Sequence, residues 1–201
     1  MSLFLPTYFS PISQYKAMVN SEQVVFEIED NFQKQTYRNR CYIYGANGKQ
    51  LLNIPVNHPA STDRKKTKDC LVENSSQWQS QHLKSLQVAY RNSPFFEFYI
   101  DDLLPIFTKK YHFLLDVNID SYTAIMEALQ LPTLYSKTTE YQLESETDYR
   151  ALANAKQTES SPFEPYIQMF DDKHGFIPDL SILDLLFMEG PNASSYLEKK
   201  E

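Results

Sequence analysis

The chain has 201 residues, of which 42% are hydrophobic and 14% aromatic, enough to form one domain with a substantial core. Its formal net charge of −7 argues against a general nucleic-acid-binding protein, because such domains are usually basic. With only 4 glycines and no GxGxxG or GxxxxGK[ST], the common glycine-rich phosphate loops are excluded. We expect neither a signal peptide nor membrane insertion, since no apolar run approaches about 18 residues, and we therefore expect a cytoplasmic protein.

The first thirty residues predict a strand, a helix and a second strand. Leu3–Phe9 is typical of a strand, and a helix is expected after it with Ser10 as its N-cap and Pro11 at its first position. Glu22–Asp30 then alternates apolar and polar side chains, which favours a second strand. This order within about 30 residues is typical of the βαβ unit of a Rossmann-like sheet.

A β-hairpin and three helices are predicted in the middle of the chain. Residues 40–56 contain two strand-like runs on either side of Asn47-Gly48, a strong hairpin signal. The polar segment His58–Asp69, with basic residues at 64, 65, 66 and 68, is expected to be an exposed mobile loop, or alternatively a clamp or lid over a polyanionic ligand. The helices are expected at Ser76–Tyr90, from Ser93-Pro94 with Pro105 limiting or kinking it, and at about 112–130.

The last third of the chain is less regular. We predict a strand at 131–136, a polar and acidic segment from about 137 to 165 with a short helix around 148–156, and a short strand at 165–170. Ser181 and Asp184 suit a capping box, and Gly190-Pro191 should end that helix and begin a last one. The resulting prediction is an α/β fold: one domain over 1–201, with a Rossmann-like start and a hairpin extension, covered by helices.

One short segment, Gln33–Arg40 (QKQTYRNR), places three cations in an acidic chain. In an extended backbone Lys34, Arg38 and Arg40 would project to one side, and in a helix Lys34 and Arg38 would be neighbours. Guanidinium groups suit carboxylate or phosphate, so the segment is a candidate anion-binding edge after the second strand. The alternative is local ion pairing with carboxylates just upstream, at Glu27, Glu29 and Asp30.

Two longer stretches carry a family resemblance. YFSPISQYKAMVNSEQVVFEIEDNFQKQTYRNRCYIYGANGKQLLNIPV and WQSQHLKSLQVAYRNSPFFEFY resemble the WbqC-like protein family, over about Tyr8–Tyr99. The resemblance implies a family with no established catalytic residues. It also implies a link to gene clusters for bacterial surface polysaccharide, where a glycine-transferring role has been suggested. The residues that match its motif are Tyr8, Gln14, Tyr15, Lys34, Arg38, Asn39, Arg40, Trp78, His82, Tyr90 and Pro94.

His82 is the candidate general acid or base, since a histidine pKa lies nearest neutrality, although a buried hydrogen-bonded role is the alternative. Glu29 and Asp30 could ligate Mg²⁺ with a diphosphate, but neutralising the nearby arginines is favoured. No HExxH, clustered metal-ligand set or GxSxG elbow occurs, and Cys41 and Cys70 are expected to be buried thiols, so we predict no metal site. No cofactor or oligomeric state is indicated.

The leading functional hypothesis is a small transferase acting on an anionic, phosphate- or carboxylate-bearing donor. Lys34, Arg38 and Arg40 would hold the anion and stabilise developing negative charge. Asn39 and Gln14 would orient polar groups, Tyr15 and Trp78 would provide stacking surface, and His82 would transfer the proton. The alternative is a non-catalytic protein that binds a ligand or an acidic partner through the same cations.

Overall fold

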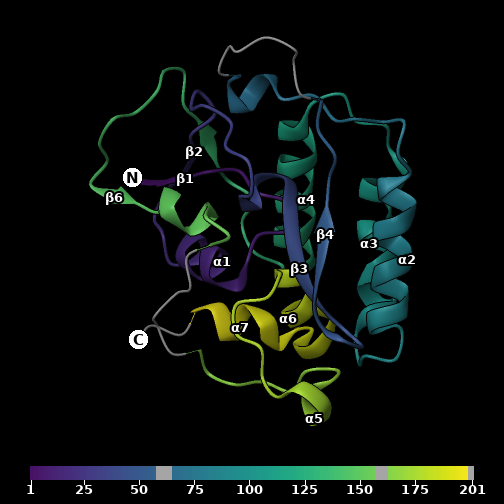
Figure 1. Ribbon diagram of the computed structural model, residues 1–201. Coiled ribbons are helices and arrows are strands. Elements are labelled where there is room, and N and C mark those ends of the chain that lie inside the picture. Colours follow the sequence, from purple (N-terminus) through teal and green to yellow (C-terminus); the bar gives the residue numbers. More distant parts are fainter. Residues whose placement is uncertain (58–64, 157–162, 199–201) are drawn as a thin grey trace.

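The computed structural model describes residues 1–57, 65–156 and 163–198. At its centre is a four-stranded sheet in the order β5-β2-β1-β6, in which every neighbouring pair is parallel. The helix α1 (Ile12–Val19) connects β1 to β2, which confirms the predicted βαβ unit (Figure 1). The strands of the sheet are β1 (Ser2–Phe4), β2 (Val24–Phe26), β5 (Ser136–Lys137) and β6 (Thr147–Asp148).

The two N-terminal strands are shorter than their sequence patterns predict. The predicted strand Leu3–Phe9 ends at Phe4, and the chain reaches a left-handed conformation at Phe9 (φ 39°) before α1 begins. Ser10 is not the N-cap of α1, because Pro11 occupies that position and the Ser10 hydroxyl contacts the hydroxyl of Thr7 instead. The first helical N–H groups are bonded by other parts of the chain, so the helix begins without a side-chain cap from its own sequence.

The predicted hairpin is confirmed as β3 (Arg40–Gly45) and β4 (Gly48–Asn53), which pair antiparallel from Arg40↔Asn53 to Gly45↔Gly48. Its turn residues are Ala46 and Asn47, one position earlier than the Asn47-Gly48 signal suggests. Gly48 follows the turn with a φ of 95°, which L side chains rarely adopt. The hairpin lies in front of α4 and beside α2 and α3 (Figure 1).

The three helices of the middle region are confirmed, with different beginnings. Two 3₁₀ helices, η1 and η2, precede them in the chain. The helix α3 has Phe95 at its N-cap position, so Ser93-Pro94 does not cap it as predicted. Pro105 lies inside α3, which continues to Thr108. These elements are η1 (Tyr37–Asn39), η2 (Thr67–Asp69), α2 (Trp78–Tyr90), α3 (Phe96–Thr108) and α4 (Leu114–Ala128).

The C-terminal helices lie below the sheet in the view of Figure 1. Ser181 caps α6 by accepting a hydrogen bond from the Leu183 N–H at 3.3 Å, as predicted. Asp184 is not the second half of a capping box, because its buried carboxylate accepts from the Tyr90 and Tyr166 hydroxyls, both at 2.6 Å. Gly190, at φ 52°, ends α6 as predicted. The elements here are α5 (Asp171–His174), α6 (Ile182–Glu189) and α7 (Asn192–Glu198).

Residues 131–170 depart most from their prediction. The strand expected at 131–136 appears only as β5, and 165–170 forms no strand. The short helix expected near 148–156 is the 3₁₀ helix η3 (Arg150–Ala153). The two-residue strand β6, which extends the sheet beside β1, has no periodic sequence pattern and was not predicted. Within the polar segment 137–165, the described residues therefore complete the sheet.

The predicted loop 58–69 falls in part outside the described residues, which resume at Lys65. From there the backbone pairs with the segment after β2: the N–H groups of Phe32, Thr67 and Lys68 donate to Lys65, Asp30 and Ile28, respectively, at 2.8–3.2 Å. Thr67 is fully buried, whereas Lys66 and Asp69 are exposed, so residues 65–69 have a paired backbone and keep part of the exposure predicted from their charge. This pairing holds Lys66 beside the carboxyl end of β2.

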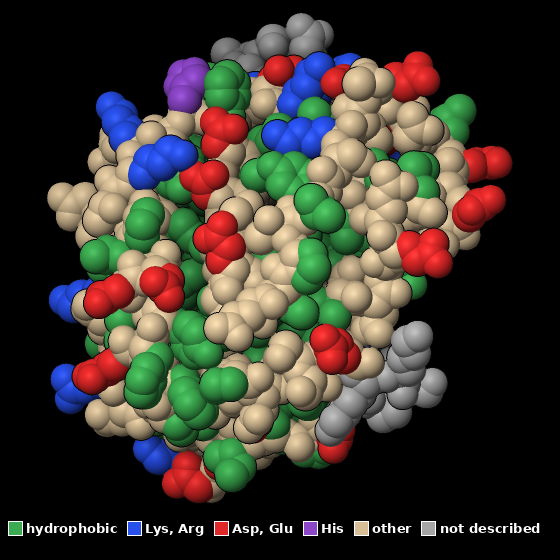
Figure 2. Space-filling view, turned by 180° about the vertical axis from the view of Figure 1, so that it is seen from behind, with side chains coloured by type: hydrophobic (Ala, Val, Ile, Leu, Met, Phe, Trp, Pro, Cys, Tyr) green, Lys and Arg blue, Asp and Glu red, His purple; other side chains and the backbone are tan. Residues whose placement is uncertain are grey.

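The core is formed by apolar and aromatic residues from both the sheet and the helices, and it includes Cys41 and Cys70 as buried free thiols. Among the described residues, no helix is long and apolar enough to cross a membrane. Figure 2 shows charged side chains of both signs spread over the face opposite to that of Figure 1, and acidic side chains along one edge.

Candidate functional site

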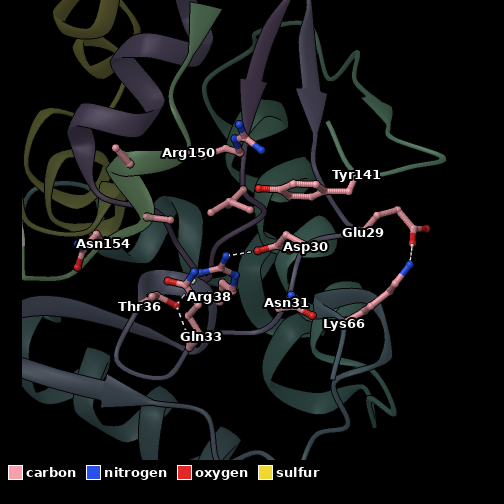
Figure 3. A pocket seen from close by; sticks show the side chains of 13 residues that line it. Glu29, Asp30, Asn31, Gln33, Thr36, Arg38, Lys66, Tyr141, Arg150 and Asn154 are labelled. Atoms are coloured by element: carbon pink, nitrogen blue, oxygen red, sulfur yellow. Dashed lines mark hydrogen bonds and ion pairs between the residues drawn. The ribbon is translucent and has the colours of Figure 1, made fainter. Parts of the chain in front are cut away.

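A pocket of about 640 Å³ lies where the parallel strands end (Figure 3). Its walls come from the segments that follow β1, β2, β5 and β6, at Leu5, Glu29–Asn31, Tyr141 and Arg150–Asn154. From β1 the chain continues to β2, which pairs with one edge of β1, and it later returns to form β6, which pairs with the other edge of β1. Ligands of open α/β sheets bind at such a reversal, outside the carboxyl ends of the strands.

One wall of the pocket is the buried pair Arg38 and Asp30. Arg38 belongs to η1, is only 1% exposed, and donates to the Asp30 carboxylate and to the Thr36 hydroxyl, the latter at 3.1 Å. Arg38 Nε and Asp30 Oδ1 are buried and have no hydrogen-bond partner among the described residues. The local pairing expected as the alternative for this arginine is therefore present, but it leaves a donor and an acceptor unsatisfied at the pocket.

The rim of the pocket carries a second group of charges. Glu29 accepts from Lys66 Nζ at 2.5 Å and from Lys68 Nζ at 2.6 Å. These two ammonium groups hold the pKa of the Glu29 carboxyl below its usual range. Lys66 lines the pocket, and its Nζ can donate more than one hydrogen bond. Glu29 thus neutralises lysines from 65–69 and not Arg40, and it leaves Lys66 with donors for a ligand.

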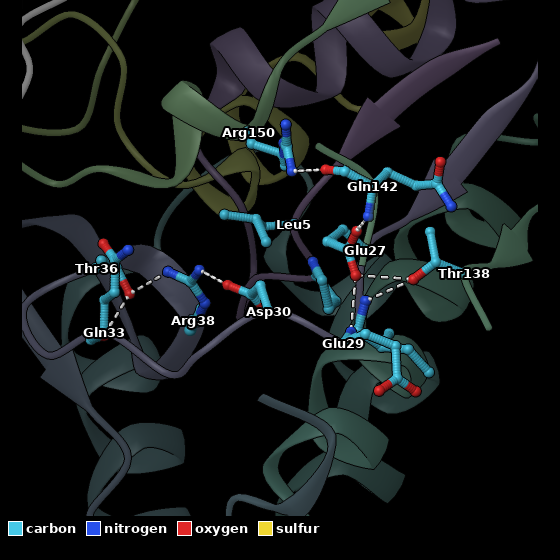
Figure 4. A network of polar contacts seen from close by, with 12 residues as sticks. Leu5, Glu27, Glu29, Asp30, Gln33, Thr36, Arg38, Thr138, Gln142 and Arg150 are labelled. Carbon is cyan, nitrogen blue, oxygen red and sulfur yellow. Dashed lines mark hydrogen bonds and ion pairs between the residues drawn. The ribbon is translucent and has the colours of Figure 1, made fainter. Parts of the chain in front are cut away.

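The opposite wall is positioned by the buried carboxylate of Glu27 (Figure 4). Glu27 accepts from the N–H of Glu29 at 2.8 Å, the hydroxyl of Thr138 at 2.9 Å and the N–H of Gln142 at 2.8 Å. The Gln142 carbonyl in turn accepts from Arg150 Nη1 at 2.7 Å. The ends of β2 and β5 are therefore tied, through one carboxylate, to the arginine that follows β6.

Arg150 is a pocket residue that the sequence did not reveal. Its guanidinium forms a short ion pair with Asp148 at 2.6 Å and lies 5.5 Å from the centre of the exposed Tyr141 ring. The strand that places it, β6, has two residues, so no hydrophobic periodicity marks it. Figure 3 shows Arg150 and Arg38 on opposite sides of the pocket.

In a Rossmann-like unit, phosphate usually binds at the N-terminus of the helix that follows the first strand, and here a side chain of the protein occupies that position. At the N-terminus of α1, the Asp179 carboxylate accepts from the Ser13 N–H at 2.8 Å and from the Ser13 hydroxyl at 2.9 Å. Gln14, predicted to orient substrate, is 1% exposed and donates to the Leu5 carbonyl at 2.8 Å. A ligand anion is therefore better placed at the cations of the pocket than at this helix end.

The predicted proton-transfer residue lies away from the pocket lining. His82 is buried between Tyr8 and Trp78, with ring centroids 5.7 and 5.3 Å away. Its Nε2 lies 3.2 Å from the Asn53 carbonyl, an acceptor, so Nε2 carries the proton and Nδ1 accepts from the Tyr8 hydroxyl at 3.0 Å. Burial lowers the His82 pKa to about 4, which keeps the ring neutral at pH 7. The predicted catalytic role of His82 stays a prediction.

The other predicted site residues are dispersed. Lys34 is exposed in a turn, Arg40 is the half-buried first residue of β3, and neither lines this pocket. Asn39 donates to the Ile54 carbonyl at 2.9 Å, and Tyr15 stacks on Tyr122 in the core. Of the cations in QKQTYRNR, the structure brings Arg38 to the pocket, because the turn and η1 break the extended geometry in which all three would align.

The chemistry of the pocket is that of a mixed-charge, hydrogen-bonding cavity. Among the described residues, its lining has two arginines, one lysine, two carboxylates, side-chain amides and one tyrosine, and neither histidine nor cysteine. In the described part of the chain, no group of three or more His, Cys, Asp or Glu could hold a metal ion. Such a lining can bind and orient a small anion with further polar groups.

These features define a parallel α/β domain with a polar pocket at the carboxyl edge of its sheet. The profile of the WbqC-like protein family matches residues 6–163, and the chain belongs to this family. The match extends through β6 and η3, beyond the stretch in which the resemblance was visible, and so includes every pocket residue except Leu5. The uncharacterized protein Rv1507c of Mycobacterium tuberculosis is 26% identical over 202 residues, which cover 86% of this chain and 87% of that protein. No solved structure shows a significant match.

Proposed function

We propose that this WbqC-like protein is a cytoplasmic transferase that binds a small phosphate- or carboxylate-bearing donor in the pocket beside Arg38. The observation that supports the proposal most is the convergence of Arg38, Lys66 and Arg150 on one pocket at the reversal point of a parallel sheet. A role in bacterial surface-polysaccharide or related biosynthesis rests on the family resemblance alone.

In this proposal the cations position the donor and stabilise negative charge that develops during transfer. A guanidinium has five N–H donors, and Arg38 uses two of them for Thr36 and Asp30. Lys66 adds a compact charge at the rim. Arg150 contributes less, because Asp148 and two backbone carbonyls already accept from it.

A non-catalytic ligand-binding protein is the second candidate, and one observation favours it. Both carboxylates of the pocket are engaged by cations, Asp30 by Arg38 and Glu29 by two lysines. Catalysis would therefore rely on positioning and electrostatic stabilisation.

The test compares two lysines that the structure makes a matched pair. Both pair with Glu29 and are partly exposed, but only Lys66 lines the pocket. Inorganic phosphate, sugar phosphates, nucleotide sugars, aminoacyl donors and acyl-CoA are screened by thermal shift on the wild type, Lys66→Ala and Lys68→Ala. A ligand at 100 times its Kd adds about 2.7 kcal/mol to the free energy of unfolding.

We expect at least one anion to stabilise the wild type and Lys68→Ala, and to bind Lys66→Ala about tenfold or more weakly. The absence of stabilisation by every anion would overturn the binding site, and equal weakening in both variants would place the anion elsewhere. For a ligand that binds, product analysis by mass spectrometry with candidate acceptors then separates a transferase from a binding protein.

A further inference from the structure

We infer that the pocket selects an anion that also carries adjacent hydroxyl groups, a furanose or pyranose phosphate, and that the Asp30–Arg38 pair binds the hydroxyls. The inference rests on the proposed anion site and adds the part of the ligand that determines specificity. It follows from three features of the same pocket: two unsatisfied atoms, the place of Asp30 in the fold, and the remaining lining.

The first feature is chemical. Asp30 Oδ1 is a buried acceptor without a donor, and Arg38 Nε is a buried donor without an acceptor, counted over the described residues. Both residues line the pocket, and both are more than nine-tenths buried. A hydroxyl has a proton to donate to a carboxylate oxygen and lone pairs to accept from a guanidinium N–H, so adjacent hydroxyls can satisfy both atoms. A bare anion would satisfy only Arg38 and would be repelled by Asp30.

The second feature is topological. Asp30 lies just beyond the carboxyl end of β2, the second strand of a βαβ unit. In sheets of this kind an acidic residue in that region accepts a hydrogen bond from a ribose hydroxyl. Here the N-terminus of α1, the usual phosphate site, is occupied by Asp179, so the anionic group of the ligand would lie at the three cations of the proposed anion site, Lys66, Arg38 and Arg150.

The third feature is the rest of the lining. The side chains of Asn31, Gln33 and Asn154 bring amide donors and acceptors to the pocket, and Tyr141 offers an aromatic face (Figure 3). Amides, a carboxylate and an aromatic ring together suit a polyhydroxylated ring better than a simple phosphate or an acyl chain. The binding mode would place the sugar ring between the Arg38 and Arg150 walls.

The decisive experiment uses the wild-type protein with ligand pairs that differ in one hydroxyl. Calorimetry compares ribose 5-phosphate with 2-deoxyribose 5-phosphate, and glucose 1-phosphate with its 2-deoxy counterpart, with inorganic phosphate as the anion alone. We expect the hydroxylated member to bind about tenfold or more tightly in one pair, because the deoxy ligand leaves buried polar atoms unsatisfied. The pair that shows the preference identifies a furanose or a pyranose.

Two variants connect that preference to Asp30. Asp30→Asn keeps the shape of the side chain, and with its amide oxygen on Arg38 it places an NH₂ group at the former Oδ1. It should lose most of the hydroxyl preference while still binding phosphate, whereas Asp148→Asn, outside the lining, should retain the preference. If Asp30→Asn does not fold, the wild-type ligand pairs still decide the question.

The outcomes separate this inference from the proposed function. Equal affinity within both sugar pairs, with phosphate still bound through Lys66, would overturn the hydroxyl selection and leave the anion site intact. A preference that survives in a folded Asp30→Asn would also overturn it, by assigning the hydroxyls to other groups. Failure of all the sugar phosphates and of the wider anion panel to bind would overturn both proposals.

Discussion

The Arg38 wall of the pocket and the Tyr8–Trp78–His82 cluster contain residues of the same family motif, yet they differ physically. Both nitrogens of His82 have partners, its ring is enclosed by aromatic side chains, and the donor of the cluster that has no partner among the described residues, Trp78 Nε1, does not line the pocket. Arg38 is as deeply buried, but it borders an open pocket and has an unsatisfied Nε. Burial of a polar group therefore does not by itself mark a candidate site; unused hydrogen-bonding capacity beside open volume is the stronger indication.

We expect the greatest loss of stability from a change in the pocket wall. Arg38→Ala removes the cation that pairs with Asp30 in a buried setting and should lower the free energy of unfolding by about 3–5 kcal/mol, measured by urea denaturation. The double variant Arg38→Ala/Asp30→Ala should recover part of this loss, because no buried charge is left unpaired. A loss below about 1 kcal/mol in the single variant would show that the buried Asp30 carboxylate does not need Arg38 to offset the cost of its burial.

The contribution of His82, in the aromatic cluster, to the free energy of unfolding should depend on pH. The pKa of His82 is about 4 in the folded protein, against 6.5 in the unfolded chain, so the unfolded state binds the proton more readily. Stability from this group is present above pH 6.5 and is lost as the pH falls towards 4, by about 3 kcal/mol in total.

The measurement is the difference in unfolding free energy between the wild type and His82→Gln at several pH values. The difference should shrink steadily from pH 7 to pH 4, since glutamine does not titrate there and other groups contribute to both proteins alike. A difference that is constant with pH would mean that His82 is protonated equally in both states, and the cluster would not be the closed environment described above.

Behind the pocket, Glu27→Gln tests the connection to Arg150. A glutamine can still accept from Glu29 and Thr138, but its amide cannot accept from the Gln142 N–H. We expect a loss of about 1–3 kcal/mol in the free energy of unfolding and weaker anion binding, because the Gln142 carbonyl would no longer hold Arg150 in place. Thr138→Val is the control, and it should affect stability more than anion binding.

The smallest effects should occur at the rim. Lys66→Ala and Lys68→Ala each leave Glu29 with one partner, so both should shift the melting temperature by no more than about 3 °C. High salt should reduce the two shifts alike. A much larger shift for Lys68→Ala would indicate that the pairing of residues 65–69 with the segment after β2 depends on this ion pair.

The elements with strong local signals were predictable. The β3-β4 hairpin, α2, α4, the Ser181 cap and the end of α6 at Gly190 all follow from turn residues, periodicity or capping chemistry. Caps were less predictable, because tertiary contacts replaced them: the Ile12 N–H donates to the Leu180 carbonyl, so Ser10 is not needed there. Asp184 likewise accepts from the Tyr90 and Tyr166 hydroxyls and does not complete the capping box that its local sequence predicts.

Patterns and motifs within short spans of the sequence were enough to predict the fold class and the family, and they singled out Arg38 as a candidate. Which polar residues share the pocket depends on contacts between distant segments of the chain. Arg150 reaches the same pocket as Arg38 because β6, a strand of two residues, pairs with a strand more than 140 positions away. The same long-range packing withdrew Gln14 and Tyr15 into the interior and left Lys34 in solvent. Contacts between distant segments have no local periodicity, and for this reason the site became visible only once the sheet was assembled.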